Sequence, residues 1–313
     1  NSENLWAYCT WMGGRANIEK PTTNALMWAS YDFMYNSNTA NTRAGSRYGG
    51  GDTSHCKIDA HTYIHESGHL LGLDDYYDYA GKCSPAGGFS MQDENVGGHD
   101  PFSIMSLGWT DPYIPTESST FIIKPFVENG DVILLTPEWN DDNSPFDEYI
   151  LVELFVNSGA NKFDCDFALR NRYQGPSRPG IRIWHVDARL AITNGYTINP
   201  NNWTTNPSTP NGKVTEMFSN SYSADRSPLG SKYINYNQLQ LIRKNTSVGL
   251  TPTDYLNNDT MFHTGDIFTM DKYYKQFVNK EDLNKGIPLN WEINMLNVTS
   301  TEATIRLTKL DLY

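Results

Sequence analysis

The sequence predicts an α+β protein in which a first domain, built around one helix, precedes an antiparallel β-sandwich. Three observations support this class. The 313 residues suffice for two domains, each with its own core. Pro112 and Pro115 bracket a change of pattern, and the chain beyond them breaks into short β-branched and aromatic runs divided by Pro, Gly and Asn. We therefore expect one domain at 1–114 and a sandwich at 115–313.

Six strand-like runs carry the prediction of a sandwich. They are Phe121–Ile123, Val132–Leu135, Tyr149–Val156, Gly180–Val186, Leu239–Ile242 and Ala303–Leu307. Between the fourth and fifth runs, residues 194–232 are rich in Asn, Thr, Ser, Pro and Gly. Such a composition predicts a long irregular insertion at the rim of the sandwich.

The first domain opens with two more strand-like runs, Leu5–Met12 and Ala25–Tyr35, separated by a polar turn around Pro21. We expect both runs to belong to a sheet beside the helix that follows.

That helix carries the most informative stretch of the chain, an HExxH motif formed by His65, Glu66 and His69. Residues four apart lie above one another on a helix, so the two histidines can offer ring nitrogens to one ion. Asp59 is the expected N-cap. The apolar set expected to bury the helix is Ile58, Ile64, Leu70 and Leu71.

A hydrolytic zinc ion takes three protein ligands and leaves a fourth position for water, so two histidines need a partner. Asp75 is the natural third ligand, because Gly72 permits the left-handed turn that ends many helices and lets the chain fold back. We expect this turn to be packed against a core by the side chains of Leu70, Leu71 and Leu73. The alternative is an ordinary amphipathic helix with two solvated histidines.

Glu66 follows the first ligand and is expected to lie beside the bound water as its general base. Zinc lowers the pKa of that water and polarises a carbonyl, so a glutamate is a strong enough base.

The motif and its surroundings resemble a known family. HExxHxxGxxD is similar to the zinc signature of metzincin-type peptidases with aspartate as third ligand, and HESGHLLGLDDYYD resembles the motif of the immune inhibitor A family, the M6 metallopeptidases. Asp74 stands where that family usually has proline. Further similar segments are 87–99, 102–109, 144–153 and 179–187.

The resemblance implies a zincin-like or metzincin-like catalytic domain and a secreted zinc endopeptidase that cleaves extracellular proteins or peptides. One of the two early strands would then pair with an extended substrate. Only 64 residues precede His65, fewer than this clan has, which leaves open that the upstream part of the catalytic domain is missing from this chain.

Metzincins place a methionine turn beneath the zinc ligands, and this chain offers two candidates. Met91 is preferred, because it lies in the family-like GGFSMQDEN segment, over Met105. The alternative is that both methionines fill gaps in the core.

Three further residues are weaker candidates for the cleft or for contacts with the ligands: Tyr76, which could line the cleft or pack over the zinc loop, and His99 and His185. His185 stands on a predicted strand, where a hydrogen-bonded structural histidine is the more common case. His61 is read as solvated or as lying behind the ligands. A calcium site near the zinc is also considered, on the oxygen-rich residues Asp78, Asp93, Glu94 and Asp100.

Composition excludes some functions. The formal net charge of −12 argues against nucleic acid as a partner, and no apolar run reaches the length of a membrane span. Abundant Tyr and Trp, with Asn-rich loops and four cysteines, are typical of a secreted protein. The sequence gives no oligomeric state.

The expected function is therefore zinc-dependent hydrolysis of peptide bonds. One alternative is a β-sandwich module that binds protein or glycan and carries a vestigial zinc site, although the intact Glu66 argues against it. Another is a zinc hydrolase that acts on something other than peptides.

Overall fold

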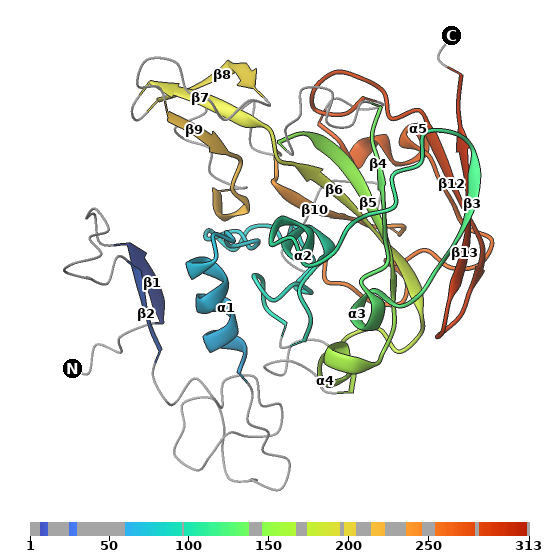
Figure 1. Ribbon diagram of the computed structural model, residues 1–313, viewed down its shortest axis with the longest axis horizontal. Helices are drawn as coiled ribbons and strands as arrows, with labels where there is room; N and C mark the ends of the chain where they lie inside the picture. Colours follow the sequence, from blue (N-terminus) through green and yellow to red (C-terminus); the bar gives the residue numbers. More distant parts are fainter. Residues whose placement is uncertain are drawn as a thin grey trace, which may run out of the picture.

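The computed structural model describes the chain at residues 7–11, 25–29, 60–95, 97–137, 146–166, 174–194, 197–204, 214–222, 236–245, 254–278 and 282–311. Over these residues the fold combines short helices with antiparallel sheets and forms no closed barrel (Figure 1). The predicted α+β class is confirmed. None of the described helices is long and apolar enough to cross a membrane.

Two four-stranded antiparallel sheets make up the larger part of the molecule. The first has the order β10-β6-β5-β4 and the second the order β11-β12-β13-β3. The strands of the first sheet are β4 (Val132–Leu135), β5 (Glu148–Phe155), β6 (Gly180–Asp187) and β10 (Leu239–Ile242). Those of the second sheet are β3 (Ser119–Ile123), β11 (Ile267–Phe268), β12 (Trp291–Val298) and β13 (Ala303–Lys309).

The facing sides of the two sheets share one buried apolar cluster. From the first sheet, β5 contributes Ile150, Val152 and Leu154. From the second, β12 and β13 contribute alternate residues such as Ile293 and Ile305. Alternate side chains of a strand point to opposite faces, so this period of two places every second residue between the sheets.

The strand β5 is apolar on its other face as well. Tyr149, Leu151 and Phe155 enter a second buried cluster, which also contains Tyr76 and Phe102 from the predicted first domain. The first sheet is thus covered on both sides, which explains why all eight residues of β5 are buried. At the predicted boundary itself, the backbone of Tyr113 hydrogen bonds with that of β4.

All six predicted strands are present, with ends that shift by up to two residues. β12 was not predicted, because its sequence WEINMLNV alternates apolar residues with Glu and Asn and contains no continuous apolar run. The insertion is not irregular where it is described. β7 (Leu190–Asn194), β8 (Thr197–Thr204) and β9 (Val214–Met217) form a three-stranded sheet.

The short helices cover the sheets and their edges. They are α2 (Pro101–Ser106), α3 (Phe126–Asn129), α4 (Lys162–Asp166) and α5 (Met270–Tyr273), with single 3-10 turns at Gly159–Asn161, Asn220–Tyr222 and Tyr274–Gln276. In α2, Asp100 caps the helix by accepting a hydrogen bond from the Ser103 amide.

Both predicted N-terminal runs contain a strand in their described part. β1 (Tyr8–Trp11) and β2 (Ala25–Trp28) pair as an antiparallel hairpin, which lies beside the helix α1 (His61–Leu70) (Figure 1). The Ser67 hydroxyl of α1 lies 3.4 Å from Sδ of Met27 in β2. Ala7 and Ala29 lie just outside the strands, and the other residues of both predicted runs, with Pro21, lie outside the described residues.

Candidate metal centre

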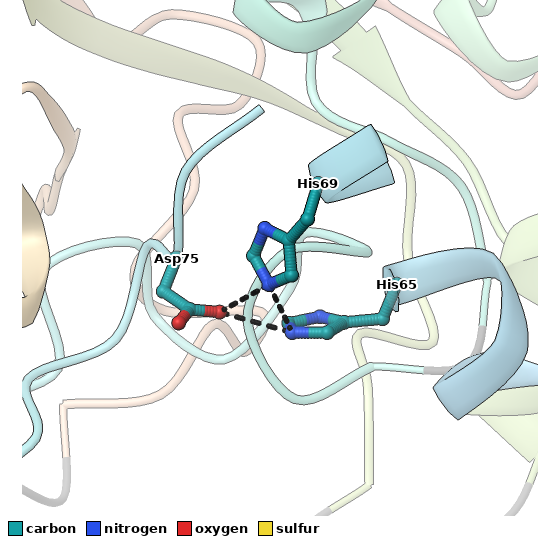
Figure 2. A group of neighbouring side chains, drawn as sticks. All are labelled: His65, His69 and Asp75. Atoms are coloured by element: carbon teal, nitrogen blue, oxygen red, sulfur yellow. Dashed lines mark hydrogen bonds and ion pairs between the residues drawn. The ribbon is translucent and has the colours of Figure 1, made fainter. Parts of the chain in front are cut away.

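Three side chains converge beside α1. His65 and His69 stand one turn apart, and their Nε2 atoms lie 3.2 Å from each other. Asp75, from the loop after the helix, places Oδ1 2.9 Å from His65 Nε2 and 3.2 Å from His69 Nε2. Figure 2 shows the two rings and the carboxylate pointing at one another.

The hydrogen bonds behind the rings determine which nitrogen faces this point. His65 Nδ1 donates to the carbonyl oxygen of Met91 at 3.0 Å, and His69 Nδ1 donates to that of Leu73 at 2.8 Å. A carbonyl can only accept, so the proton of each neutral ring is on Nδ1. Both Nε2 atoms then present lone pairs, and Asp75 Oδ1 is buried without a hydrogen-bond donor among the described residues.

Three converging lone pairs repel one another unless a cation lies among them. The three residues can hold a metal ion. Bonds of about 2.0–2.1 Å in a tetrahedron give ligand atoms about 3.3 Å apart, close to the observed separations. A backbone carbonyl on the second nitrogen is also the usual support for a metal-bound histidine.

The electrostatics agree with a site built for positive charge. Burial works to lower the pKa of His69, but the Asp75 carboxylate, to which a protonated ring can donate, and the Leu73 carbonyl raise it to about 9. For Asp75, burial acts to raise the pKa, and donation from the histidines, once protonated, overrides it and holds that pKa well below its usual range. Without a metal, a proton takes the place of the cation.

A sharp turn brings Asp75 to the histidines. The helix ends at Leu70, and Gly72 adopts φ of 96°, a left-handed conformation that strains residues with a Cβ. The Leu73 amide then donates to the Gly68 carbonyl at 3.0 Å. This confirms the predicted role of Gly72.

The predicted apolar face of the helix is wrong. Ile64, Leu70 and Leu71 are exposed, Leu71 to 57%, and of the three leucines around the turn only Leu73 is buried. The buried face of α1 is instead polar and consists of His61, Thr62, His65, Glu66 and Gly68. The N-cap is Ala60, which makes no side-chain cap bond, and Asp59 and Ile58 lie outside the described residues.

Two residues for which the sequence predicted no contact with Asp75 hold it. The Tyr79 hydroxyl donates to Oδ2 of Asp75 at 2.5 Å, and the Asp75 amide donates to Oδ1 of Asp74 at 2.9 Å. Tyr79 in turn receives backbone support, since its amide donates to the carbonyl of Ser221. The only sequence signal for these contacts was the density of aromatic and acidic residues after the motif.

The loop that contains Met91 supports the helix from below. Besides the Met91 carbonyl on His65, Gln92 Nε2 donates to the His65 carbonyl at 3.2 Å, and the Gln92 carbonyl accepts from the Tyr76 amide at 2.8 Å. Gly68 makes room for this side chain, because a Cβ there would lie 2.3 Å from Gln92 Oε1. Met105, the other candidate for a methionine turn, packs on the second apolar cluster.

Two arginines of the first sheet fix the same loop. Arg182 of β6 pairs with Glu153 at 2.6 Å and donates to the Phe89 carbonyl at 3.0 Å. Arg243, just after β10, donates to the carbonyls of Ser84 and Leu241. The geometry of the centre therefore depends on residues beyond the predicted first domain.

Glu66 lies in the same cavity as the three converging residues. Its side chain is buried, with a residue exposure of 5%, and Oε2 has no hydrogen-bond partner among the described residues. Burial raises the pKa of Glu66. A carboxylate so placed can accept a proton from a molecule in the cavity.

The cavity has a volume of about 540 Å³ and is bounded by α1, β1 and the loops after the helix. It is lined by Ala7, Tyr8, Cys9, Trp11, His61, Thr62, His65, Glu66, His69, Leu73, Asp74, Asp75, Tyr77, Tyr79, Asp93 and Glu94. His61 belongs to this lining and is buried, with its ring centroid 5.4 Å from that of His65. Of the two alternatives for His61, the solvated one is therefore wrong, and a place behind the ligands stays a prediction.

Tyr76 and His99 do not line the cavity. Tyr76 is fully buried, packs against Phe102 with ring centroids 6.1 Å apart, and accepts a hydrogen bond from the Ser103 hydroxyl. This is the packing role considered for it. His99 is half-buried, and burial lowers its pKa. Among the described residues, the tyrosines that line the cavity are Tyr8, Tyr77 and Tyr79.

His185 does not take part in the site. It lies on β6, where Nε2 bonds Oε1 of Glu148 at 2.7 Å, and its ring packs 5.0 Å from Phe277. Glu148 also accepts from the backbone amides of Asn284 and Lys285. The weaker suggestion, a place in the cleft, is not supported, and His185 has the structural role that is common for a strand histidine.

The acidic residues suggested for calcium do not converge. Asp78 accepts from the Lys82 amide, Asp93 from the Gly88 amide, and Asp100 from Ser90 and Ser103. Within the described residues, His65, His69 and Asp75 form the one group with metal-ligand geometry. Calcium is therefore not supported by the described geometry.

Comparisons of the chain with protein-family models, with curated proteins and with solved structures found no match. The fold and the site define an α+β protein whose buried two-histidine, one-carboxylate group can hold a metal ion.

Proposed function

We propose that this protein is a zinc-dependent peptidase that hydrolyses peptide bonds with Glu66 as general base. The observation that carries the proposal is the convergence of His65 Nε2, His69 Nε2 and Asp75 Oδ1 in the cavity that also holds Glu66, whose Oε2 has no hydrogen-bond partner in the described part of the chain. Three ligands of this type are one fewer than zinc accepts, which leaves a position for water. The resemblance of the motif to M6 peptidases supports the same reaction class.

When bound, zinc would supply a Lewis acid that makes water more acidic and polarises a carbonyl. The chain supplies the remaining parts. His65 and His69 stay neutral with their protons on Nδ1, held by the carbonyls of Met91 and Leu73. Asp75 adds one negative charge and keeps Oδ1 directed inward, because Oδ2 is bound by Tyr79.

Glu66 accepts the proton of the attacking water and then donates it to the leaving amine. Its raised pKa favours the first step, because burial makes the carboxylate a stronger base. Met91 keeps its proposed place as the methionine beneath the ligands, since its carbonyl holds His65 and its side chain is buried.

We extend the proposal to a secreted enzyme that acts on extracellular proteins, on the basis of the resemblance and the composition. A binding module with a vestigial site has less support, because such a module has no use for a buried carboxylate in the cavity of the ligands.

The experiment is a casein digestion assay with and without a chelator, performed on wild-type protein and on Glu66→Gln after zinc loading. The proposal expects wild-type cleavage that stops with chelator and returns with zinc. It expects Glu66→Gln to keep one zinc and lose about 10³-fold or more of the rate. Equal cleavage by Glu66→Gln would contradict it. Cleavage only of small esters or amides would indicate a different hydrolase.

A further inference from the structure

A segment of the insertion lies against the loop that carries Asp75. This loop, residues 73–79, is called the metal loop below. The segment consists of residues 219–222, which follow β9 and contain the 3-10 turn Asn220–Tyr222. In the chain, 144 positions separate Asn220 from Tyr76 of the metal loop, yet the two are in contact (Figure 1). The insertion therefore reaches the metal centre.

The side chain of Asn220 joins the metal loop to β10. It is fully buried, and Nδ2 donates to the carbonyl oxygens of Tyr76 at 3.0 Å and of Leu239 at 2.6 Å. Its Oδ1 accepts from the Leu239 amide at 3.2 Å. Leu239 begins β10, an edge strand, and edge strands offer backbone groups that lack a partner strand. A carboxylate or a hydroxyl could not make all three bonds, because two of them need donor hydrogens.

The neighbours of Asn220 contact two more residues of the metal loop. The Ser221 carbonyl accepts from the Tyr79 amide at 2.9 Å, and the Ser219 side chain hydrogen bonds with Asp74. Tyr79 and Asp74 are the residues that hold Asp75, through its Oδ2 and its amide. Both supports of the third ligand are thus themselves supported by the segment.

The backbone of the metal loop is held from outside the loop. Tyr76 directly follows Asp75. Its amide donates to the Gln92 carbonyl, and its carbonyl accepts from Asn220. Together the two bonds fix the chain immediately after the ligand. Because Tyr76 is only 1% exposed, its carbonyl would be left buried without this donor if Asn220 were truncated. A buried carbonyl without a donor is costly, so the loop should shift.

We infer that Asn220 is a positioning residue of the metal centre. It holds the metal loop in the arrangement in which Oδ1 of Asp75 faces the Nε2 atoms of His65 and His69. The inference rests on the zinc centre of the proposed function, and it is independent of the substrate that is cleaved.

The test compares metal binding by wild-type protein and Asn220→Ala. Competition with a chromophoric chelator gives the zinc affinity, which we expect to fall about tenfold or more, as for other residues that support a metal ligand. Cobalt(II) serves as a second probe, because its visible absorption reports the coordination geometry. We expect the cobalt spectrum of Asn220→Ala to differ from that of wild type, since the carboxylate of Asp75 is displaced.

Gln240→Ala is the matched control. Gln240 is a buried amide on β10, like the amide that contacts β10 from Asn220, but its side chain bonds the Gln276 carbonyl and the Asn237 side chain. This variant should lose stability and keep the zinc affinity and the cobalt spectrum of wild type. Asn220→Ser, which keeps one hydroxyl for the Leu239 backbone, is the milder second variant and decides the test if Asn220→Ala does not fold.

Wild-type zinc affinity and an unchanged cobalt spectrum in the folded Asn220 variant would overturn the inference. An equal loss of affinity in Gln240→Ala would also overturn it, because metal binding would then merely follow stability. Both results leave the proposed function intact. If the wild-type protein itself binds no zinc, the proposed function fails and the inference fails with it.

Discussion

The Tyr79 hydroxyl donates to Asp75 Oδ2 at 2.5 Å, on the opposite side of the carboxylate from the two histidines. This bond leaves Oδ1 as the oxygen directed at both Nε2 atoms. A partner in this position orients the ligand and lowers the cost of holding a charged carboxylate in a buried site. Tyr79 is therefore a positioning residue for the metal centre.

We expect Tyr79→Phe to weaken zinc binding about 10–100-fold, the range that such supporting residues give. Competition with a chromophoric chelator measures the affinity directly, without an activity assay. Tyr113→Phe, which removes an exposed hydroxyl far along the chain from the centre, serves as the matched control and should match wild type. Wild-type affinity in Tyr79→Phe would show that the bond does not position Asp75.

Gly68 and Gln92 form a second pair that can be tested. A Cβ at position 68 would displace the Gln92 side chain and break its bond to the His65 carbonyl. We expect Gly68→Ala to lower the free energy of unfolding by about 1–3 kcal/mol, although alanine is otherwise the better helix former.

A double-mutant cycle with Gln92→Ala isolates the contact, with thermal or urea unfolding as the readout. Once the Gln92 side chain is removed, Gly68→Ala should be neutral or stabilising. An equal loss from Gly68→Ala in both backgrounds would show that the clash is not with Gln92.

For His185, the structure predicts an effect on stability and none on the metal. Replacing it with Gln leaves the buried Glu148 with a poorer partner, so the unfolding free energy should fall by about 1–3 kcal/mol. Zinc affinity of the folded variant, measured by the same chelator competition, should equal that of wild type. A tenfold loss of zinc affinity would contradict the structural role.

The contacts of Asp187 predict how the free energy of unfolding changes at low pH. Burial acts to raise the pKa of Asp187, but the paired guanidinium of Arg189 and the Asn284 amide lower it below its usual range. A carboxylate with a depressed folded pKa stabilises the fold above its unfolded pKa of about 3.9 and loses this contribution as the pH falls through the folded value.

Unfolding free energies of wild type and Asp187→Asn should be measured from pH 7 down to about 2. The variant should be less stable at pH 7, and the difference should shrink steadily as the pH falls below about 4. Asp111→Asn, at an exposed site, is the control and should follow wild type throughout. A difference that stays constant down to the lowest pH would mean that the charge of Asp187 is not the source of its contribution.

The sequence predicted the centre well because its geometry is local. His65, His69 and Asp75 lie within eleven residues, and helical spacing with one left-handed glycine determines how they meet. Most strands of the two larger sheets could also be predicted. Burial on both faces leaves a continuous apolar run in the sequence, as at residues 149–152 of β5.

The contacts that support the centre could not be predicted, because they join distant parts of the chain. The Met91 carbonyl accepts from His65 of α1, and the Phe89 carbonyl accepts from Arg182. Any residue can offer a backbone carbonyl, so these contacts leave no pattern in the sequence. The prediction of an apolar buried face for α1 was also wrong. A helix that carries a metal site buries its ligands, so the polar side chains of α1 face inward and Leu71 is left in solvent.

The central claim is that His65, His69 and Asp75 bind one divalent cation, and elemental analysis of the purified protein after zinc loading and desalting tests it most directly. We predict one zinc per chain for wild type and for Glu66→Gln, and less than about a tenth of that for Asp75→Ala and for His69→Ala, whose sites lack a ligand. Circular dichroism confirms that the variants are folded. A wild-type protein without zinc, or an Asp75→Ala variant that retains a full equivalent, would contradict the claim.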